Sequence, residues 1–193
     1  MIKAIIFDCF GVLTTDGWLP FKKEHFGHDK QLLDKATELN SLANSRLMSY
    51  QEFLSRIAQL AGLSAERVRA IVENSVANQE LLDYIKSLKP KYKIGMLSNA
   101  SRNLLGELFS KSQVNLFDEI ALSYETGIPK PDSRAYIEAA QDLGLKPSQC
   151  VFIDDQEKHI AGARQVGMKA ILYKDFAQMK SELVEILSTV PDN

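Results

Sequence analysis

The first thirteen residues constrain the fold of this chain more than any other stretch. Five of the six residues from Ile2 to Phe7 are apolar, and the acid Asp8 follows at once. A short apolar run rich in branched residues is typical of a strand buried on both faces of a parallel sheet. Asp8 is then expected at the carboxyl end of that strand, where open parallel sheets bind their ligands. By itself, Asp8 is equally consistent with a turn cap, a nucleophile or a metal ligand.

Length and composition limit the class of protein. A chain of 193 residues suits one domain, or one domain with a sizeable insertion. The formal net charge of −2 gives no reason to expect nucleic acid or a membrane surface as a partner. Cys9 and Cys150 lack metal-like spacing and are expected to be buried thiols in a reducing compartment. With neither a signal peptide nor an apolar run of membrane-spanning length, we expect a cytoplasmic protein.

The segment 15–77 contains apolar residues at helical spacing and no strand pattern. Ser49, followed by Glu52 three residues later, predicts a capping box, and Gly62 is typical of a helix end. We therefore expect a small bundle of three to four helices in this segment.

After residue 77, strand and helix patterns alternate, which predicts an α/β fold with a Rossmann-like parallel sheet between helices. The expected strands after the first are 92–97, 119–122, 151–153 and 169–173.

The helical bundle separates the first two expected strands, so it is an insertion into the α/β domain. We expect residues 1–14 and 78–193 to form the α/β core domain. Residues 15–77 are expected to form a helical cap domain above the strand end that bears Asp8, where it is well placed to act as a lid.

Polar residues follow the expected strands at the edge where Asp8 lies. They are, in chain order, Asp8, Ser98 with Asn99, Lys130 in the sequence GIPKP, and Asp154 with Asp155.

Three carboxylates in one small volume repel each other unless they bind protons or a cation. Oxygen ligands of this kind suit Mg²⁺, which usually keeps waters that a phosphate replaces. Lys130 adds a positive charge to that of the metal ion, so this edge of the sheet could bind a phosphoryl group. A carboxylate that attacks this group forms an acyl phosphate, and the Ser98 hydroxyl could donate to one of its oxygens.

These residues and their order resemble the haloacid dehalogenase superfamily, most of whose members are Mg²⁺-dependent phosphatases, and the resemblance covers the whole chain. The segment DCFGVL that begins at Asp8 resembles the first motif of the family, Ser98-Asn99 the second, and Lys130 the third. IDDQEKHIAGARQVG resembles the fourth, and the helical insertion resembles the family's cap. The third and fourth motifs are most similar to those of sugar-phosphate and glucose-1-phosphate type phosphatases.

The resemblance implies a role for each matching residue and a small phosphorylated metabolite as substrate. Asp8 is the implied nucleophile and a metal ligand, Lys130 screens charge between it and the phosphate, and Ser98 holds the transferred group. The implied ligands of Mg²⁺ are Asp8, the backbone carbonyl of Phe10, Asp155 and its neighbour Asp154. Asn99 is expected to bind substrate with Ser98, and Arg46 of the cap is our choice for an anion contact.

Two positions depart from the pattern of the family. Most of its phosphatases have a second Asp two residues after the nucleophile as general acid and base, where this chain has Phe10. A phenyl ring cannot move a proton, and such catalysis is typically worth about 10²–10⁴-fold. His159 stands where the fourth motif often has Asp or Asn. It could orient Asp155 or Lys130, supply part of the missing proton transfer, or be a helix-surface residue without a role.

Three functions stay open at this point. The first is a phosphatase, slow because it lacks the acid and base. The second is a haloacid dehalogenase, since those enzymes also have an aromatic residue at the position of Phe10 and release a halide that needs no proton. The third is a non-catalytic protein that binds a phosphate ligand or a partner. The sequence favours no particular oligomeric state.

Overall fold

A five-stranded sheet forms the centre of the structure, a computed structural model that describes residues 1–188. All pairings are parallel and the strand order is β3-β2-β1-β4-β5. This arrangement confirms the expected α/β fold, and β1 lies in the middle of the sheet with all of its residues buried. The strands are β1 (Ala4–Phe7), β2 (Lys93–Ser98), β3 (Glu119–Leu122), β4 (Cys150–Asp154) and β5 (Lys169–Leu172).

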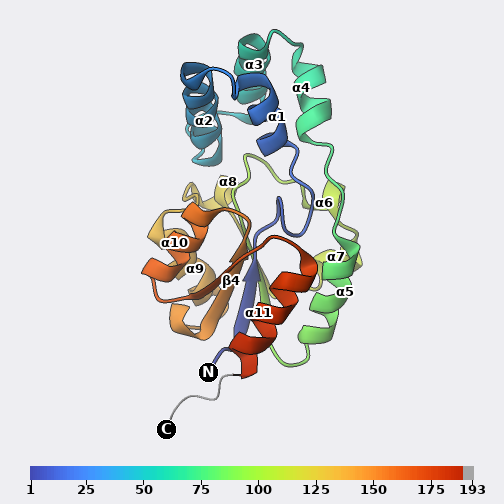
Figure 1. Cartoon of the computed structure of the whole chain (residues 1–193), viewed down its shortest axis with the longest axis vertical. Helices are drawn as coiled ribbons and strands as arrows, with labels where there is room; N and C mark the ends of the chain where they lie inside the picture. Colours follow the sequence, from blue (N-terminus) through green and yellow to red (C-terminus); the bar gives the residue numbers. More distant parts are fainter. Residues whose placement is uncertain (189–193) are drawn as a thin grey trace.

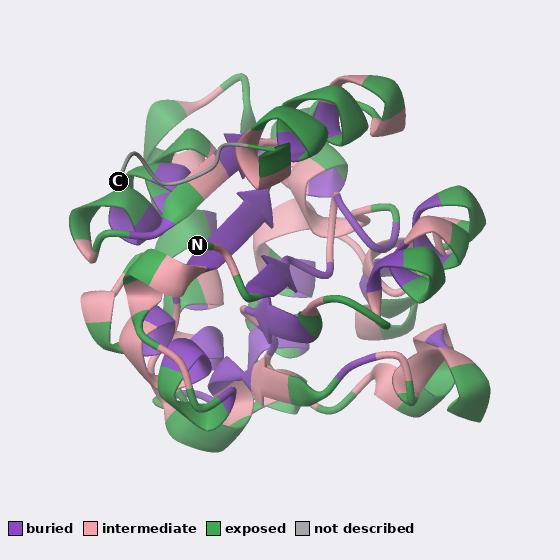
Figure 2. Ribbon diagram, turned by 90° about the horizontal axis from the view of Figure 1, so that it is seen from below, coloured by how far each residue is buried: buried purple, intermediate pink, exposed green. Residues whose placement is uncertain are grey.

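Helices cover both faces of the sheet (Figure 1). Successive residues of β1 point to opposite faces, so Ile5 and Phe7 belong to one apolar cluster and Ala4 and Ile6 to another. The first cluster is completed by α5 (Gln79–Leu88) and α11 (Phe176–Ser188), the second by α9 (Ser133–Asp142) and α10 (Glu157–Gln165). Short helices complete the connections: α6 (Leu105–Leu108), α7 (Lys111–Val114), α8 (Ser123–Thr126) and the 3₁₀ turn η1 (Pro147–Gln149). Figure 2 shows the buried strands between helices whose outer turns are exposed.

Four helices of residues 18–72 pack around an apolar cluster of their own, beyond the carboxyl end of the strands (Figure 1). They are α1 (Trp18–Phe26), α2 (Lys30–Asn44), α3 (Tyr50–Ala61) and α4 (Ala65–Val72).

The cap of α3 differs from the predicted capping box. The Ser49 hydroxyl accepts the backbone N–H of Glu52 as expected. The Glu52 carboxylate, however, pairs with Arg56 at 2.6 Å instead of returning to the backbone of Ser49. Gly62 ends the helix as expected, with a φ of 66°.

The chain passes from the sheet to these four helices and back through two adjacent segments. Thr14 and Ala77 form an isolated antiparallel bridge, and the N–H of Asn78 donates to the carbonyl of Leu13 at 2.8 Å. The crossings lie where the sequence predicts the ends of the inserted domain, and this division into domains stays a prediction. Residues 189–193, the end of the predicted core domain, lie outside the described part of the chain.

Within residues 1–188, no helix combines the length and the apolar composition that crossing a membrane requires.

The separate apolar cluster of α1–α4 predicts a stability effect. Leu54 is 1% exposed in this cluster, so Leu54→Ala is expected to lower the free energy of unfolding by about 2–5 kcal/mol. Leu47 is 76% exposed, so Leu47→Ala should change the free energy of unfolding by no more than about 0.5 kcal/mol. Urea denaturation followed by circular dichroism measures both, and equal losses in the two variants would contradict the proposed packing.

Candidate active site

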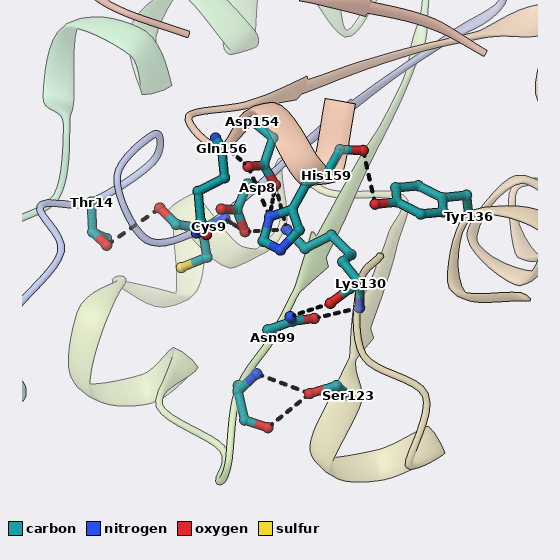
Figure 3. A network of polar contacts seen from close by, with 11 residues as sticks. Asp8, Cys9, Thr14, Asn99, Ser123, Lys130, Tyr136, Asp154, Gln156 and His159 are labelled. Atoms are coloured by element: carbon teal, nitrogen blue, oxygen red, sulfur yellow. Dashed lines mark hydrogen bonds and ion pairs between the residues drawn. The ribbon is translucent and has the colours of Figure 1, made fainter. Parts of the chain in front are cut away.

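A buried lysine lies between two buried carboxylates at the carboxyl end of the central strands (Figure 3). Asp8 directly follows β1, and Asp154 ends the neighbouring strand β4. The Lys130 Nζ donates to Asp8 Oδ1 at 2.6 Å and to Asp154 Oδ2 at 2.7 Å. The Lys130 side chain is fully buried, so water screens neither ion pair and both attractions are strong.

The pKa values of these groups follow from burial and from their mutual charges. Burial raises the pKa of Asp8 well above its usual value against the opposing effect of Lys130, and the negative charges of Asp154 and Asp155 raise it further. Burial acts in the same direction on Asp154, but Lys130 and His159 hold its pKa well below its usual range. Burial disfavours the charged form of Lys130, yet the two carboxylates raise its pKa. Of the two carboxylates that pair with Lys130, Asp8 is therefore the one whose charge is compensated less.

Asn99 holds the loop of Lys130 in place. Its Oδ1 accepts the Lys130 N–H at 2.7 Å, and its Nδ2 donates to the Lys130 carbonyl at 2.9 Å. Asn99 lines the cavity above the site, but both ends of its amide are engaged. Asn99 therefore positions the backbone of Lys130, and that it also binds substrate stays a prediction.

Two oxygen atoms near the site are buried without a partner in the described chain: Ser98 Oγ and Asp155 Oδ1. Ser98 ends β2, beside β1, and is 1% exposed. Burial, followed by the charge of Asp154, raises the pKa of Asp155 to about 6. Gly11 has a φ of 89°, and a Cβ there would lie 2.3 Å from Asp155 Oδ2, so glycine alone lets the loop after Asp8 pass this carboxylate.

His159 is buried and faces Asp154. Its Nδ1 lies 3.0 Å from both carboxylate oxygens of Asp154, and its Nε2 is buried without a partner in the described residues. The interpretation of His159 as a helix-surface residue is therefore wrong, and so is that of a residue orienting Asp155. Burial lowers the pKa of the imidazole, although Asp154 opposes this effect.

A cavity of about 310 Å³ opens above these groups, between the sheet edge and helices α1–α4. Asp8, Lys130 and His159 line it from the sheet side, together with Phe10. Arg46, expected as an anion contact, does not line this cavity. Its Nη1 donates to the carbonyl of Glu125 at 2.9 Å, which links the segment after α2 to α8 outside the cavity.

Sequence reasoning missed five charged residues of the cavity wall: Asp16, Lys22, Glu73, Glu107 and Lys158. Only Lys158 lies within a motif, and the motif assigns it no role. The one sequence indication was their position, since Asp16 and Lys22 begin the insertion and Lys158 lies in the fourth motif.

An ion-pair network closes one side of the cavity. Arg102, from the loop after β2, pairs with Glu73 at 2.8 Å and with Glu107 at 2.6 Å. The Tyr50 hydroxyl donates to the same Glu73 carboxylate at 2.7 Å, and the Arg102 guanidinium lies over the Tyr50 ring. The two glutamates of the cavity wall are therefore already neutralised.

Asp155 makes the stability of the metal-free protein pH-dependent. Its folded pKa of about 6 exceeds the model-peptide value of 3.8, so folded Asp155 keeps a proton that the unfolded chain releases in this range. The free energy of unfolding is therefore expected to fall as the pH rises from about 4 to about 6. Asp155→Asn removes this cost and should raise the free energy of unfolding by about 2 kcal/mol at pH 8, but not near pH 4. Thermal unfolding in EDTA at the two pH values tests this, and an equal shift at both would contradict it.

Comparison with known proteins gives the same assignment as the fold. Residues 2–167 match the haloacid dehalogenase-like hydrolase family. Phosphatase MT3486 of Mycobacterium tuberculosis is 29% identical over 98% of this chain and 95% of its own length. D-ribitol-5-phosphate phosphatase of Bacteroides thetaiotaomicron is 26% identical over 98% of this chain and its own full length.

The fold is shared with solved structures. A HAD family enzyme of Bacteroides thetaiotaomicron, solved in complex with magnesium and inorganic phosphate, superposes with a TM-score of 0.71 and 24% identity. The superposition covers 93% of this chain and 99% of that one. With a family match over most of its length and this shared fold, the chain belongs to the haloacid dehalogenase-like hydrolase family.

Proposed function

We propose that this protein is a Mg²⁺-dependent phosphatase that hydrolyses the phosphate monoester of a small metabolite, such as a sugar phosphate, through an aspartyl-phosphate on Asp8. The main observation in its favour is the buried Lys130 between Asp8 and Asp154, with the unpartnered oxygens of Ser98 and Asp155 nearby. Two relatives that are named as phosphatases, one of them for a sugar-alcohol phosphate, support this class of reaction.

The residues present fit a magnesium ion. Asp155 Oδ1 is buried without a hydrogen-bond donor, and Asp8 Oδ2 accepts no hydrogen bond from residues 1–188. Three carboxylates face a single ammonium, so negative charge is in excess, and oxygen atoms are the donors that Mg²⁺ prefers. Asp8, Asp155 and the carbonyl of Phe10 would hold the ion. When bound, Mg²⁺ neutralises charge on the phosphate and orients it for substitution.

Asp154 fits a different role from that of a direct ligand. Ligand atoms of Asp8, Asp154 and His159 lie within 4.8 Å of one another. The Lys130 ammonium, however, donates hydrogen bonds to the carboxylates of Asp8 and Asp154. In addition, Asp154 Oδ1 accepts the N–H of Gln156 at 2.8 Å. Asp154 is therefore proposed to anchor Lys130 and His159.

The chain's own groups account for the substitution. A carboxylate oxygen of Asp8 attacks phosphorus, the bond from phosphorus to the ester oxygen breaks, and an acyl phosphate forms. Lys130 offsets the repulsion between this carboxylate and the phosphate, and the Ser98 hydroxyl, which has no partner in the described chain, donates to a phosphoryl oxygen. Water then cleaves the acyl phosphate, which releases inorganic phosphate and restores Asp8.

Phe10 leaves the departing alkoxide without the usual proton donor. Phe10 lines the cavity, and its side chain packs against the apolar cluster of the core and carries no group that can donate a proton. Since general acid catalysis is typically worth about 10²–10⁴-fold, turnover of alkyl phosphates is expected to be slow. Esters with acidic leaving groups need less protonation and should react faster.

Removal of the nucleophile tests the proposal. With p-nitrophenyl phosphate, Mg²⁺-dependent release of phosphate should fall more than about 10³-fold in Asp8→Asn, because an amide does not form the acyl phosphate. Asp83→Asn, on the exposed side of α5, serves as the matched control and should keep full activity. Full activity of Asp8→Asn, or activity of the wild type unaffected by EDTA, would refute the proposed mechanism.

Phe10 provides a gain-of-function test. Phe10→Asp returns a carboxyl group to the position of the missing proton carrier and should raise kcat for alkyl phosphates by about 10- to 100-fold. It should raise kcat much less for p-nitrophenyl phosphate, whose leaving group needs no proton. An unchanged or lower kcat for both substrates would show that Phe10 instead serves packing.

The aromatic Phe10 in the cavity wall also favours a second candidate, a haloacid dehalogenase. Chloride release from 2-chloropropionate in EDTA would support it. The buried negative charge of Asp154 and Asp155 weighs against this candidate, because an anionic haloacid would approach two carboxylates of which, in the described residues, Asp154 alone pairs with Lys130. Absence of both activities over a broad substrate panel would favour a non-catalytic binding protein.

A further inference from the structure

Two lysines line the cavity apart from the Asp8–Lys130–Asp154 cluster. Lys22 comes from α1 and Lys158 from α10, so they reach the cavity from the helical insertion and from the α/β core. Within residues 1–188, neither ammonium lies within 4.0 Å of a carboxylate oxygen. Lys22 Nζ has one hydrogen bond, to Thr37 Oγ1 at 3.4 Å.

The carboxylates of the cavity wall are engaged elsewhere. Asp8 pairs with Lys130, and both glutamates pair with Arg102. Asp16 accepts the N–H groups of Trp18 and Leu19 at the start of α1. Burial and the nearby Lys158 lower the pKa of Lys22, and the charge of Asp16 opposes them only in part. The two lysines therefore form a positive region with which no carboxylate of residues 1–188 forms an ion pair, although Asp16 offsets some of its charge.

A polar stripe of α2 borders this region. Thr37, Asn40, Ser41 and Asn44 all line the cavity, at the three- and four-residue spacing of one helix face. Asn44 is 8% exposed, and its side-chain amide makes no hydrogen bond with the described residues. In the described residues, the fully buried polar side-chain atoms without a partner belong to Ser75, Ser98, Asp155 and His159, so the amide of Asn44 keeps access to the cavity and can bind a ligand group there.

We propose that Lys22, Lys158 and Asn44 bind a second anionic group of the substrate, so that this protein prefers phosphate monoesters with a carboxylate or a second phosphate at the end remote from the transferred group. This inference rests on the proposed phosphatase function. The phosphoryl group that is transferred binds at Asp8 and Lys130, and the lysine pair is left for the other end. A cavity of about 310 Å³ is at the small end of ligand sites, which favours a compact metabolite.

A matched pair of substrates tests the proposal. 3-Phosphoglycerate and glycerol 3-phosphate differ only in a carboxylate that replaces a hydroxymethyl group. The kcat/KM of the wild type should be at least about tenfold higher for 3-phosphoglycerate. This factor corresponds to the free energy of one good charge-assisted contact. Lys22→Met and Lys158→Met should each remove most of this preference, mainly through KM. Lys23→Met, an exposed neighbour on α1 outside the cavity wall, should leave it unchanged.

The outcomes separate the second anionic site from other roles of the lysines. An equal loss for both substrates in Lys22→Met and Lys158→Met would show that the lysines hold the transferred phosphate, and would overturn the proposal. The absence of any preference in the wild type would also overturn it.

A binding measurement keeps this test independent of turnover. Calorimetric titration of Asp8→Asn with 3-phosphoglycerate and with glycerol 3-phosphate, in Mg²⁺, should show at least about tenfold tighter binding of the former. Adding Lys22→Met to Asp8→Asn should equalise the two Kd values. If the wild type hydrolyses neither ester but this difference in Kd is found, the phosphatase function fails and the anion site stands. Equal Kd values in Asp8→Asn would refute the anion site whatever the activity.

Discussion

The Lys130 ammonium, 2.6 Å from Asp8 and 2.7 Å from Asp154, lets two buried carboxylates lie at the ends of adjacent strands. Without it, parallel pairing of β1 and β4 would bring two like charges together away from water. Asn99 fixes the backbone of Lys130 through two hydrogen bonds, so the position of the ammonium depends on β2 as well. The site is thus a product of the sheet order, with β1 between the two strands that support it.

Burial gives this cluster its chemical character. Lys130 pairs with both carboxylates, but it cannot fully compensate Asp8, Asp154 and the neighbouring Asp155. Accordingly, the pKa values of Asp8 and Asp155 are raised, and an oxygen of Asp155 has no partner within residues 1–188. These are the properties expected of a site that is completed by a cation and an anionic ligand. In the proposed function, that cation is Mg²⁺ and the ligand is a phosphate ester.

The helical insertion supplies the other half of the cavity. Its four helices have their own apolar cluster, and they meet the core through the Arg102–Glu73 ion pair and the Arg46 bond to Glu125. The insertion thereby brings Lys22 near Lys158 in the wall of the cavity above the Asp8–Lys130–Asp154 cluster. In the proposed division of labour, the core determines the reaction and the insertion determines which phosphate ester is accepted.

The sequence by itself determined the strands, the order of the polar residues at their ends and the departure at Phe10, because buried parallel strands are continuous apolar runs and strand ends share one edge. Only the tertiary structure decided where side chains from separate elements point. In the folded protein, His159 faces Asp154, Arg46 lies outside the cavity, and Lys22 and Lys158 line it. The physical reason is that such contacts depend on how helices pack across the chain, and a local pattern of residues does not encode this packing.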